Sequence, residues 1–139
     1  MPQLDAYLLF DGNCADAMRF YERTLGGKLE MLMTHADSPV AAQAPPGSAD
    51  LIMHARLALG DRILMGSDAP PGQPAGGMKG FSLSLICPTA VEAKRLFEAL
   101  ADGGKVTMPL QKTFWAEAFG MLVDRFGTPW MVNGAMAPM

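Results

Sequence analysis

The spacing of hydrophobic residues in the first half of the chain predicts a strand, a helix and three more strands. The short apolar run at 4–10 is typical of a strand. After it, apolar residues recur at helical spacing, which predicts an amphipathic helix that begins after the N-cap residue Asn13. Its apolar stripe consists of Cys14, Met18, Tyr21 and Leu25. Three further strand-like runs follow, at 28–35, 51–59 and 62–67, with Gly60-Asp61 as a two-residue hairpin turn between the last two.

The second half of the chain repeats this order of elements. Residues 89–99 (TAVEAKRLFEA) resemble residues 13–23 (NCADAMRFYER), and both segments run into a Gly-Gly-Lys tripeptide. Thr89 and Glu92 fit a capping box at the start of the second helix. The strands expected around this helix are 80–86, 105–110, 118–124 and 130–133. The pattern indicates an internal duplication.

This duplication predicts an α+β protein of two tandem βαβββ modules, one at 1–69 and the other at 79–139. Residues 70–78, rich in proline and glycine, are expected to be a linker. A second Pro/Ala/Gly-rich stretch, 37–50, lies inside the first module. Such a loop is either a mobile lid or a tolerated insertion, and both interpretations stay open.

Composition narrows the class of protein. The chain has 139 residues, half of them hydrophobic and 18% charged, which is typical of one folded domain rather than a disordered chain. A net charge of −3 disfavours nucleic acid as a partner, because phosphate binding needs clustered positive charge. The N-terminus has neither a basic segment nor a long apolar run, so no signal peptide and no membrane contact is expected. Two cysteines are too few for a disulfide framework and favour a cytoplasmic location.

Short motifs along nearly the whole chain carry a resemblance to a known family. They are FDGNC (10–14), FY (20–21), LGG (25–27), MHARL (53–57), MGSD (65–68), TFWA (113–116), FGM (119–121), DRFG (124–127) and WM (130–131). With the duplication, they resemble the vicinal oxygen chelate superfamily of glyoxalase I, extradiol dioxygenases and bleomycin-resistance proteins. They are most similar to its PhnB-like branch, often labelled demethylubiquinone methyltransferase-like. No glycine-rich loop after a parallel strand supports a methyl-donor cofactor.

The resemblance implies two curved sheets that form a cleft, which in metal-using members holds a divalent ion through four ligands. Two ligand positions lie on the first strands and two on the last strands of the modules. The resemblance puts the former near Ala6 and Ser82, and the latter near Met65 or Gly66 and within 131–133. None of these residues is His, Asp or Glu, so neither a metal nor another cofactor is expected. His35, Asp37 and Glu117 could form only an improvised site.

Two groups of residues are candidates for ligand binding. In strand 51–59, the residues at alternate positions from Met53 should pack on a helix, which puts His54 and Arg56 together on the opposite face. Arg56 could anchor a carboxylate or phosphate, and His54 could bind the same ligand or act as a base. In the second module, Trp115 could offer a flat apolar surface, with Gln111 and Glu117 as polar contacts. The alternatives are a solvated strand face for the first group and core or dimer packing for the second.

The remaining polar residues suggest structural roles. Cys14 would lie in the first turn of a helix, where the helix dipole lowers a thiol pKa, but its place on the apolar stripe favours a buried structural cysteine. Asp61, Asp68 and Asp124 lie at turns and strand ends, where capping is their usual role.

These observations predict a small-molecule-binding protein, or an enzyme of unassigned reaction, that uses the cleft between the modules without a metal. The resemblance implies a homodimer, because related clefts are often built between chains. One alternative is a metal-dependent lyase or isomerase of the glyoxalase type. Another is a drug-sequestering protein of the bleomycin-resistance type, for which a net charge of −3 is slight. The sequence identifies neither the ligand nor a reaction.

Overall fold

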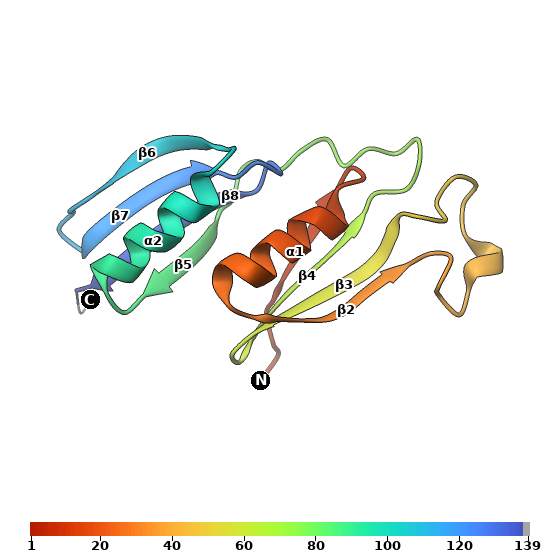
Figure 1. Cartoon of the computed structure of the whole chain (residues 1–139), viewed down its shortest axis with the longest axis horizontal. Coiled ribbons are helices and arrows are strands. Elements are labelled where there is room, and N and C mark those ends of the chain that lie inside the picture. Colours follow the sequence, from red (N-terminus) through yellow and green to blue (C-terminus); the bar gives the residue numbers. More distant parts are fainter. Residues whose placement is uncertain (138–139) are drawn as a thin grey trace. The chain divides into compact units, whose positions relative to one another are not determined.

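Two four-stranded sheets, each with one helix, form the fold in this computed structural model, which describes residues 1–137 (Figure 1). The α+β class and the two βαβββ modules are therefore confirmed. The chain divides into two compact units, Met1–Gly77 and Met78–Met139. The elements of the first unit are β1 (Ala6–Phe10), α1 (Cys14–Leu25), β2 (Lys28–Thr34), the 3-10 helix η1 (Ala41–Gln43), β3 (Ile52–Leu59) and β4 (Arg62–Asp68). Those of the second unit are β5 (Leu83–Cys87), α2 (Ala90–Ala101), β6 (Lys105–Gln111), β7 (Ala116–Val123) and β8 (Pro129–Met136).

Both sheets have the same topology. The strand orders are β1-β4-β3-β2 and β5-β8-β7-β6, and in each sheet the first and last strands of the module pair in parallel while the other pairs are antiparallel. In the first unit, α1 packs on the face that carries Leu8, Ala55 and Leu57, all of which are buried. The opposite face, here called the open face, carries Tyr7, Leu9 and Met31, which remain exposed. Alternation along the strands thus sorts the side chains as the sequence pattern predicts.

The first strands of the two modules are offset by 77 positions rather than 76, and this corrects the expected ligand positions. β5 begins at Leu83, so Ser82 precedes the strand and is not the counterpart of Ala6. Ala6 shares the helix-facing side with Leu8 and Phe10. The open-face residues of β1 are therefore Tyr7 and Leu9. The two helices are 76 positions apart, and the one-residue shift arises because three residues separate β1 from α1 whereas two separate β5 from α2.

The two helices are capped in different ways. Thr89 Oγ1 accepts a hydrogen bond from the Glu92 backbone N–H (3.1 Å), as the predicted capping box requires. Asn13 occupies the N-cap position of α1, as predicted, but its side chain makes no capping hydrogen bond. Asp68, at the end of β4, supplies this function instead: its Oδ1 accepts from the N–H groups of Gly12 and Cys14, both at 3.0 Å. The second carboxylate oxygen accepts from the Ile52 N–H (2.9 Å), which ties β3 to the same residue.

The glycine pair after each helix has a structural explanation. Gly26 and Gly103 have φ values of 81° and 76°, in the left-handed region that a side chain disfavours. The second glycine of each pair lies against the backbone of a neighbouring hairpin. A Cβ on Gly27 would lie 2.4 Å from the Ala58 oxygen, and one on Gly104 would lie 2.3 Å from the Val123 oxygen. Conformation thus requires the first glycine and space requires the second.

The 37–50 loop is closed at its base. His35 N–H donates to the Leu51 oxygen and Ala36 N–H to the Ala49 oxygen, both at 3.1 Å, so the β2–β3 hairpin continues into the loop. Ser38 and Ser48 are buried within it. The predicted linker begins against the first unit, because the Ala75 N–H donates to the Asp11 carboxylate (2.7 Å). Within residues 1–137, no helix is long and apolar enough to cross a membrane.

Candidate functional site

The open face of the first sheet brings together residues from all four of its strands. In the strand register, Tyr7 of β1 pairs with Met65 of β4, Met65 pairs with Arg56 of β3, and Arg56 pairs with Met31 of β2. His54 lies two positions from Arg56 on the same side of β3, as its sequence spacing predicts. The result is a surface of flexible methionines that surround a few polar groups, which is the usual make-up of a small-molecule site.

Tyr7 orients the His54 imidazole. The Tyr7 hydroxyl lies 3.3 Å from His54 Nδ1, and the two rings stack with centroids 5.8 Å apart. Depending on the tautomer, the hydroxyl either donates to Nδ1 or accepts from it. In both cases Nε2 is the nitrogen available to a ligand, as a donor in the first case and as an acceptor or base in the second. The sequence pattern does not single out Tyr7, because only strand pairing brings it next to His54.

Arg56 already has a partner within the sheet. Its Nε lies 3.0 Å from Glu30 Oε1 of β2, and both side chains are 43% exposed. Such a half-exposed ion pair contributes little to stability, but it fixes the direction of the guanidinium. The two terminal nitrogens of the fork can still bind a carboxylate or phosphate. Glu30 is a second residue that the sequence pattern did not single out.

The predicted residues of the second unit separate into different environments. Trp115 Nε1–H donates to Asn133 Oδ1 (3.3 Å), and the Trp115 ring packs edge-on against Phe119 with centroids 5.1 Å apart. These contacts anchor Trp115 to β8 and β7 and leave Phe114, 85% exposed, as the protruding aromatic residue of this segment. Gln111 is exposed at the end of β6.

Glu117 lines a pocket of about 430 Å³ in the second unit. The walls come from the β6–β7 hairpin, the end of β8 and the residue after β5. The lining residues are Pro88, Lys112, Thr113, Phe114, Ala116, Glu117, Ala135, Met136 and Ala137. Of this set, only Glu117 is a binding candidate predicted from the sequence.

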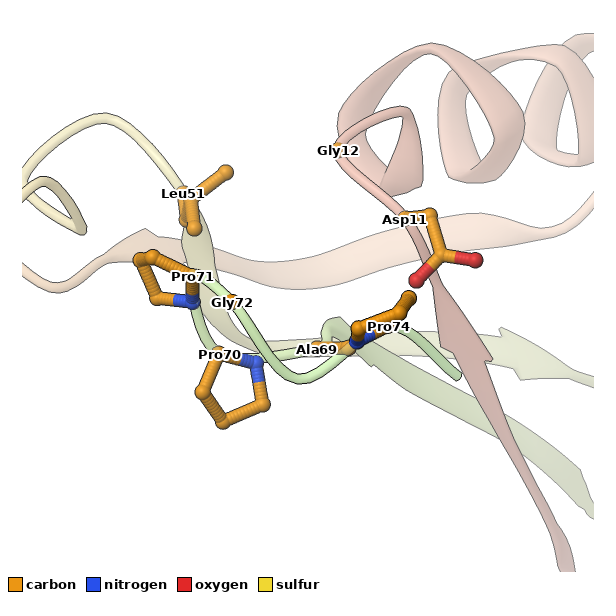
Figure 2. A pocket seen from close by; sticks show the side chains of 8 residues that line it. All are labelled: Asp11, Gly12, Leu51, Ala69, Pro70, Pro71, Gly72 and Pro74. Carbon is orange, nitrogen blue, oxygen red and sulfur yellow. The ribbon is translucent and has the colours of Figure 1, made fainter. Parts of the chain in front are cut away.

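A smaller pocket of about 240 Å³ lies in the first unit, where the segment after β4 passes the end of β1 (Figure 2). Pro70, Pro71 and Pro74 form much of its lining, with Leu51 and Asp11. One Asp11 oxygen already accepts the Ala75 N–H, so the carboxylate helps to hold the segment that forms the wall. Its role here is structural.

The side chains on the first and last strands do not fit a divalent metal ion. The open-face pairs at the expected ligand positions are Tyr7 with Met65, Leu9 with Ser67, Ser84 with Met131, and Ile86 with Asn133. Hard divalent ions prefer carboxylates and imidazoles, and no member of these pairs has either group. Within residues 1–137, no three His, Cys, Asp or Glu side chains lie close enough together to hold an ion.

Cys14 is a structural residue. It is fully buried on the apolar stripe of α1, and its thiol lies under Gly66 of β4. Burial, with a smaller effect of the nearby Asp68 carboxylate, raises the pKa of Cys14 from 9.0 to about 12. This outweighs any lowering by the helix dipole, so the thiol stays protonated at neutral pH. Cys87 is also buried and free, and burial raises its pKa.

Comparison with known proteins identifies the family. The family described as the glyoxalase/bleomycin resistance protein/dioxygenase superfamily matches residues 3–132. The chain belongs to this superfamily. The match covers both modules, in agreement with the duplication.

Individual relatives in this superfamily cover almost the whole chain. Protein YjdN of Escherichia coli (strain K12) is 41% identical over 138 residues, which covers 94% of this chain and 93% of that protein. The crystal structure of protein PA1353 from Pseudomonas aeruginosa is 50% identical, with a TM-score of 0.89 over 96% of this chain and 97% of that one. A Bacillus cereus PhnB protein, described as a putative 3-demethylubiquinone-9 3-methyltransferase, is 24% identical, with a TM-score of 0.79 over 95% and 98% of the two chains. The last likeness shows the fold alone, so the predicted resemblance to PhnB-like members is confirmed at the level of the fold.

Proposed function

We propose that this protein binds a small organic anion on the open face of its first sheet, without a metal ion. The observation that carries this proposal is the direction of two polar groups on that face. Tyr7 holds the His54 imidazole and Glu30 holds the Arg56 guanidinium, so both are oriented before any ligand arrives. Preoriented groups lower the entropy cost of binding.

The spacing of His54 and Arg56 allows one small ligand to contact both side chains. Residues two apart on one strand face lie about 7 Å apart. A carboxylate or phosphate bound to the Arg56 fork would therefore leave the neighbouring atoms of a small ligand within reach of His54 Nε2. The methionines that flank Arg56, Met31 and Met65, can adapt to the remaining apolar part of the ligand. Whether His54 also moves a proton depends on the ligand, so the proposal covers a binding protein or an enzyme.

Substitutions of Arg56 test the proposal. Small carboxylates and phosphate esters are screened by thermal shift, and the best compound is measured by calorimetry. Arg56→Ala should weaken binding by about 30-fold, or about 2 kcal/mol, because it removes a charge-assisted contact. Glu30→Gln should strengthen binding, because the amide oxygen can still accept the Arg56 Nε–H and hold the guanidinium, while the competing negative charge is removed. Arg62→Ala, which removes an exposed arginine at the start of β4, is the matched control.

In Arg56→Ala, the Glu30 carboxylate loses its partner and could itself repel an anionic ligand. The double variant Arg56→Ala/Glu30→Gln removes this charge as well, so it reports the loss of the guanidinium alone. It should bind as weakly as Arg56→Ala. If its affinity equals that of the native protein, Arg56 acts only by neutralising Glu30 and does not contact the ligand. A dissociation constant that none of these substitutions changes would refute the proposed site.

We also propose that the protein is a cytoplasmic homodimer, and that residues 70–78 link modules at 1–69 and 79–139. The homodimer rests on the family resemblance, and the location on the two free buried cysteines, which suit a reducing compartment. Light scattering of the purified protein should give twice the mass of the 14.8 kDa chain. A monomeric mass would contradict the dimer.

A further inference from the structure

The 430 Å³ pocket of the second unit has the properties of a separate ligand site. Its volume lies in the range of pockets that hold small molecules. Its lining includes one cationic side chain, Lys112, and one carboxylate, Glu117, beside the apolar Phe114 and Met136. None of these residues belongs to the proposed anion site.

The wall that carries the two charges is rigidly built. Thr113 Oγ1 accepts hydrogen bonds from the N–H groups of Trp115 (3.3 Å) and Ala116 (3.2 Å). The Thr113 N–H donates to the Ala116 oxygen (3.0 Å), which closes the turn between β6 and β7. Trp115 is anchored in turn to Asn133. Lys112, Phe114 and Glu117 therefore project from a fixed turn rather than from a mobile loop.

The opposite wall contains a strained residue. Ala135, in β8, has φ 52°, and within residues 1–137 it is the single non-glycine residue with positive φ. The left-handed conformation is unfavourable for a residue with a Cβ, so it persists only where neighbours enforce it. Here Gly134 packs against α2, and the Ala137 N–H donates to the Trp115 oxygen (2.6 Å). The contacts on both sides of Ala135 thus hold the pocket wall in an unfavourable conformation.

The two charged residues of the pocket are not paired with each other. No Lys112–Glu117 ion pair is present in the part of the chain that the structure describes, although both residues line the pocket. Phe114, between them in sequence, is 85% exposed. Two separate opposite charges beside an exposed apolar surface match a ligand that carries both charges and an apolar group.

We propose that this pocket binds a free α-amino acid with an apolar side chain. Lys112 Nζ binds the carboxylate, the Glu117 carboxylate binds the ammonium group, and Phe114 with Met136 contacts the apolar side chain. No covalent step is involved.

Titration of the full-length ¹⁵N-labelled protein with L-leucine tests this site. Amide signals of residues 112–117 and 134–137 should shift and saturate. N-acetyl-L-leucine, L-leucinamide and glycine each lack one of the three recognised groups, and each should bind more weakly. For the first two the loss should be about two- to fivefold, which is what a solvent-exposed ion pair contributes.

Variants of the two charged residues provide the matched comparison. Lys112→Ala and Glu117→Gln should each weaken L-leucine binding by about two- to fivefold. Lys94→Ala and Glu98→Gln remove the same charges from an exposed pair on α2 (3.7 Å) and should change nothing. The proposal is overturned by the absence of a saturable shift, by shifts that centre on His54 and Arg56, or by equal affinity for the analogues. It does not depend on the anion site, which Arg56→Ala tests independently.

Discussion

Asp68, at the end of β4, connects this strand to the starts of α1 and β3. Its carboxylate accepts three backbone N–H groups, two at the start of α1 and one at the start of β3. Because it is buried, these charge-assisted hydrogen bonds are protected from water. In the register of the second sheet the corresponding residue is Gly134, which provides space for α2 instead of a cap.

Removal of the Asp68 carboxylate should therefore destabilise the protein strongly. We expect Asp68→Ala to lower the free energy of unfolding by about 3 kcal/mol or more, because it leaves buried N–H groups without their acceptor. Urea unfolding measures this change. Asp61→Ala, in the exposed β3–β4 turn, is the control and should change stability by less than about 0.5 kcal/mol. An equal effect of the two substitutions would contradict the role of Asp68.

The burial of Cys14 predicts how the stability of the folded protein changes with pH. Since its pKa rises from 9.0 to about 12, the folded state disfavours the thiolate that the unfolded chain forms. The contribution to stability is fully present below pH 9 and is lost as the pH rises towards 12. In a Cys87→Ala background, native Cys14 should react with a thiol reagent at pH 8 far more slowly than in urea. Equal rates in the native and unfolded protein would show that the thiol is accessible.

At the scale of single elements, the helices of the two modules reach similar lengths with different N-terminal caps. α2 carries its cap in its own sequence, at Thr89, whereas α1 receives its cap from a strand that lies about fifty residues later in the chain. A local pattern can reveal the first kind of cap but not the second. This explains why the position of both caps was predicted, whereas the source of the hydrogen bonds was predicted only for Thr89.

The two cap positions should respond differently to substitution. Thr89→Ala should cost about 1 kcal/mol, because the Glu92 N–H loses its acceptor. Asn13→Ala should cost clearly less, because its side chain makes no capping hydrogen bond. Thermal unfolding of the two variants provides the comparison. A larger loss in Asn13→Ala would mean that its side chain contributes in a way that the structure does not show.

At the scale of the whole molecule, the two units share one topology but carry different side chains on the sheet face opposite the helix. In corresponding registers, the first sheet has His54 and Arg56 where the second has Phe119 and Met121. The duplicated scaffold therefore offers polar contacts in one unit and mainly apolar contacts in the other. In neither unit do the paired first and last strands present the carboxylates or imidazoles that a divalent ion prefers on this face.

The absence of suitable ligands leads to a prediction about metal content. Protein purified without chelators should contain only substoichiometric Ni, Zn, Fe or Mn by elemental analysis. Addition of EDTA should leave its thermal midpoint unchanged, since no bound ion would stabilise the fold. Stoichiometric metal together with a lower midpoint in EDTA would instead favour the metal-dependent glyoxalase-type alternative.

The sequence alone was sufficient for the duplication, the order of elements and the shared face of His54 and Arg56. Each of these depends on hydrophobic periodicity or on residues that end a helix, such as Gly26-Gly27. Both signals act within a few residues along the chain. The sequence was not sufficient for the partners of those residues, Tyr7 and Glu30, or for the distant backbone groups that Asp68 caps. Those contacts arise from strand pairing and sheet register, which join residues far apart in sequence and can shift by one position without changing the hydrophobic pattern of the helices.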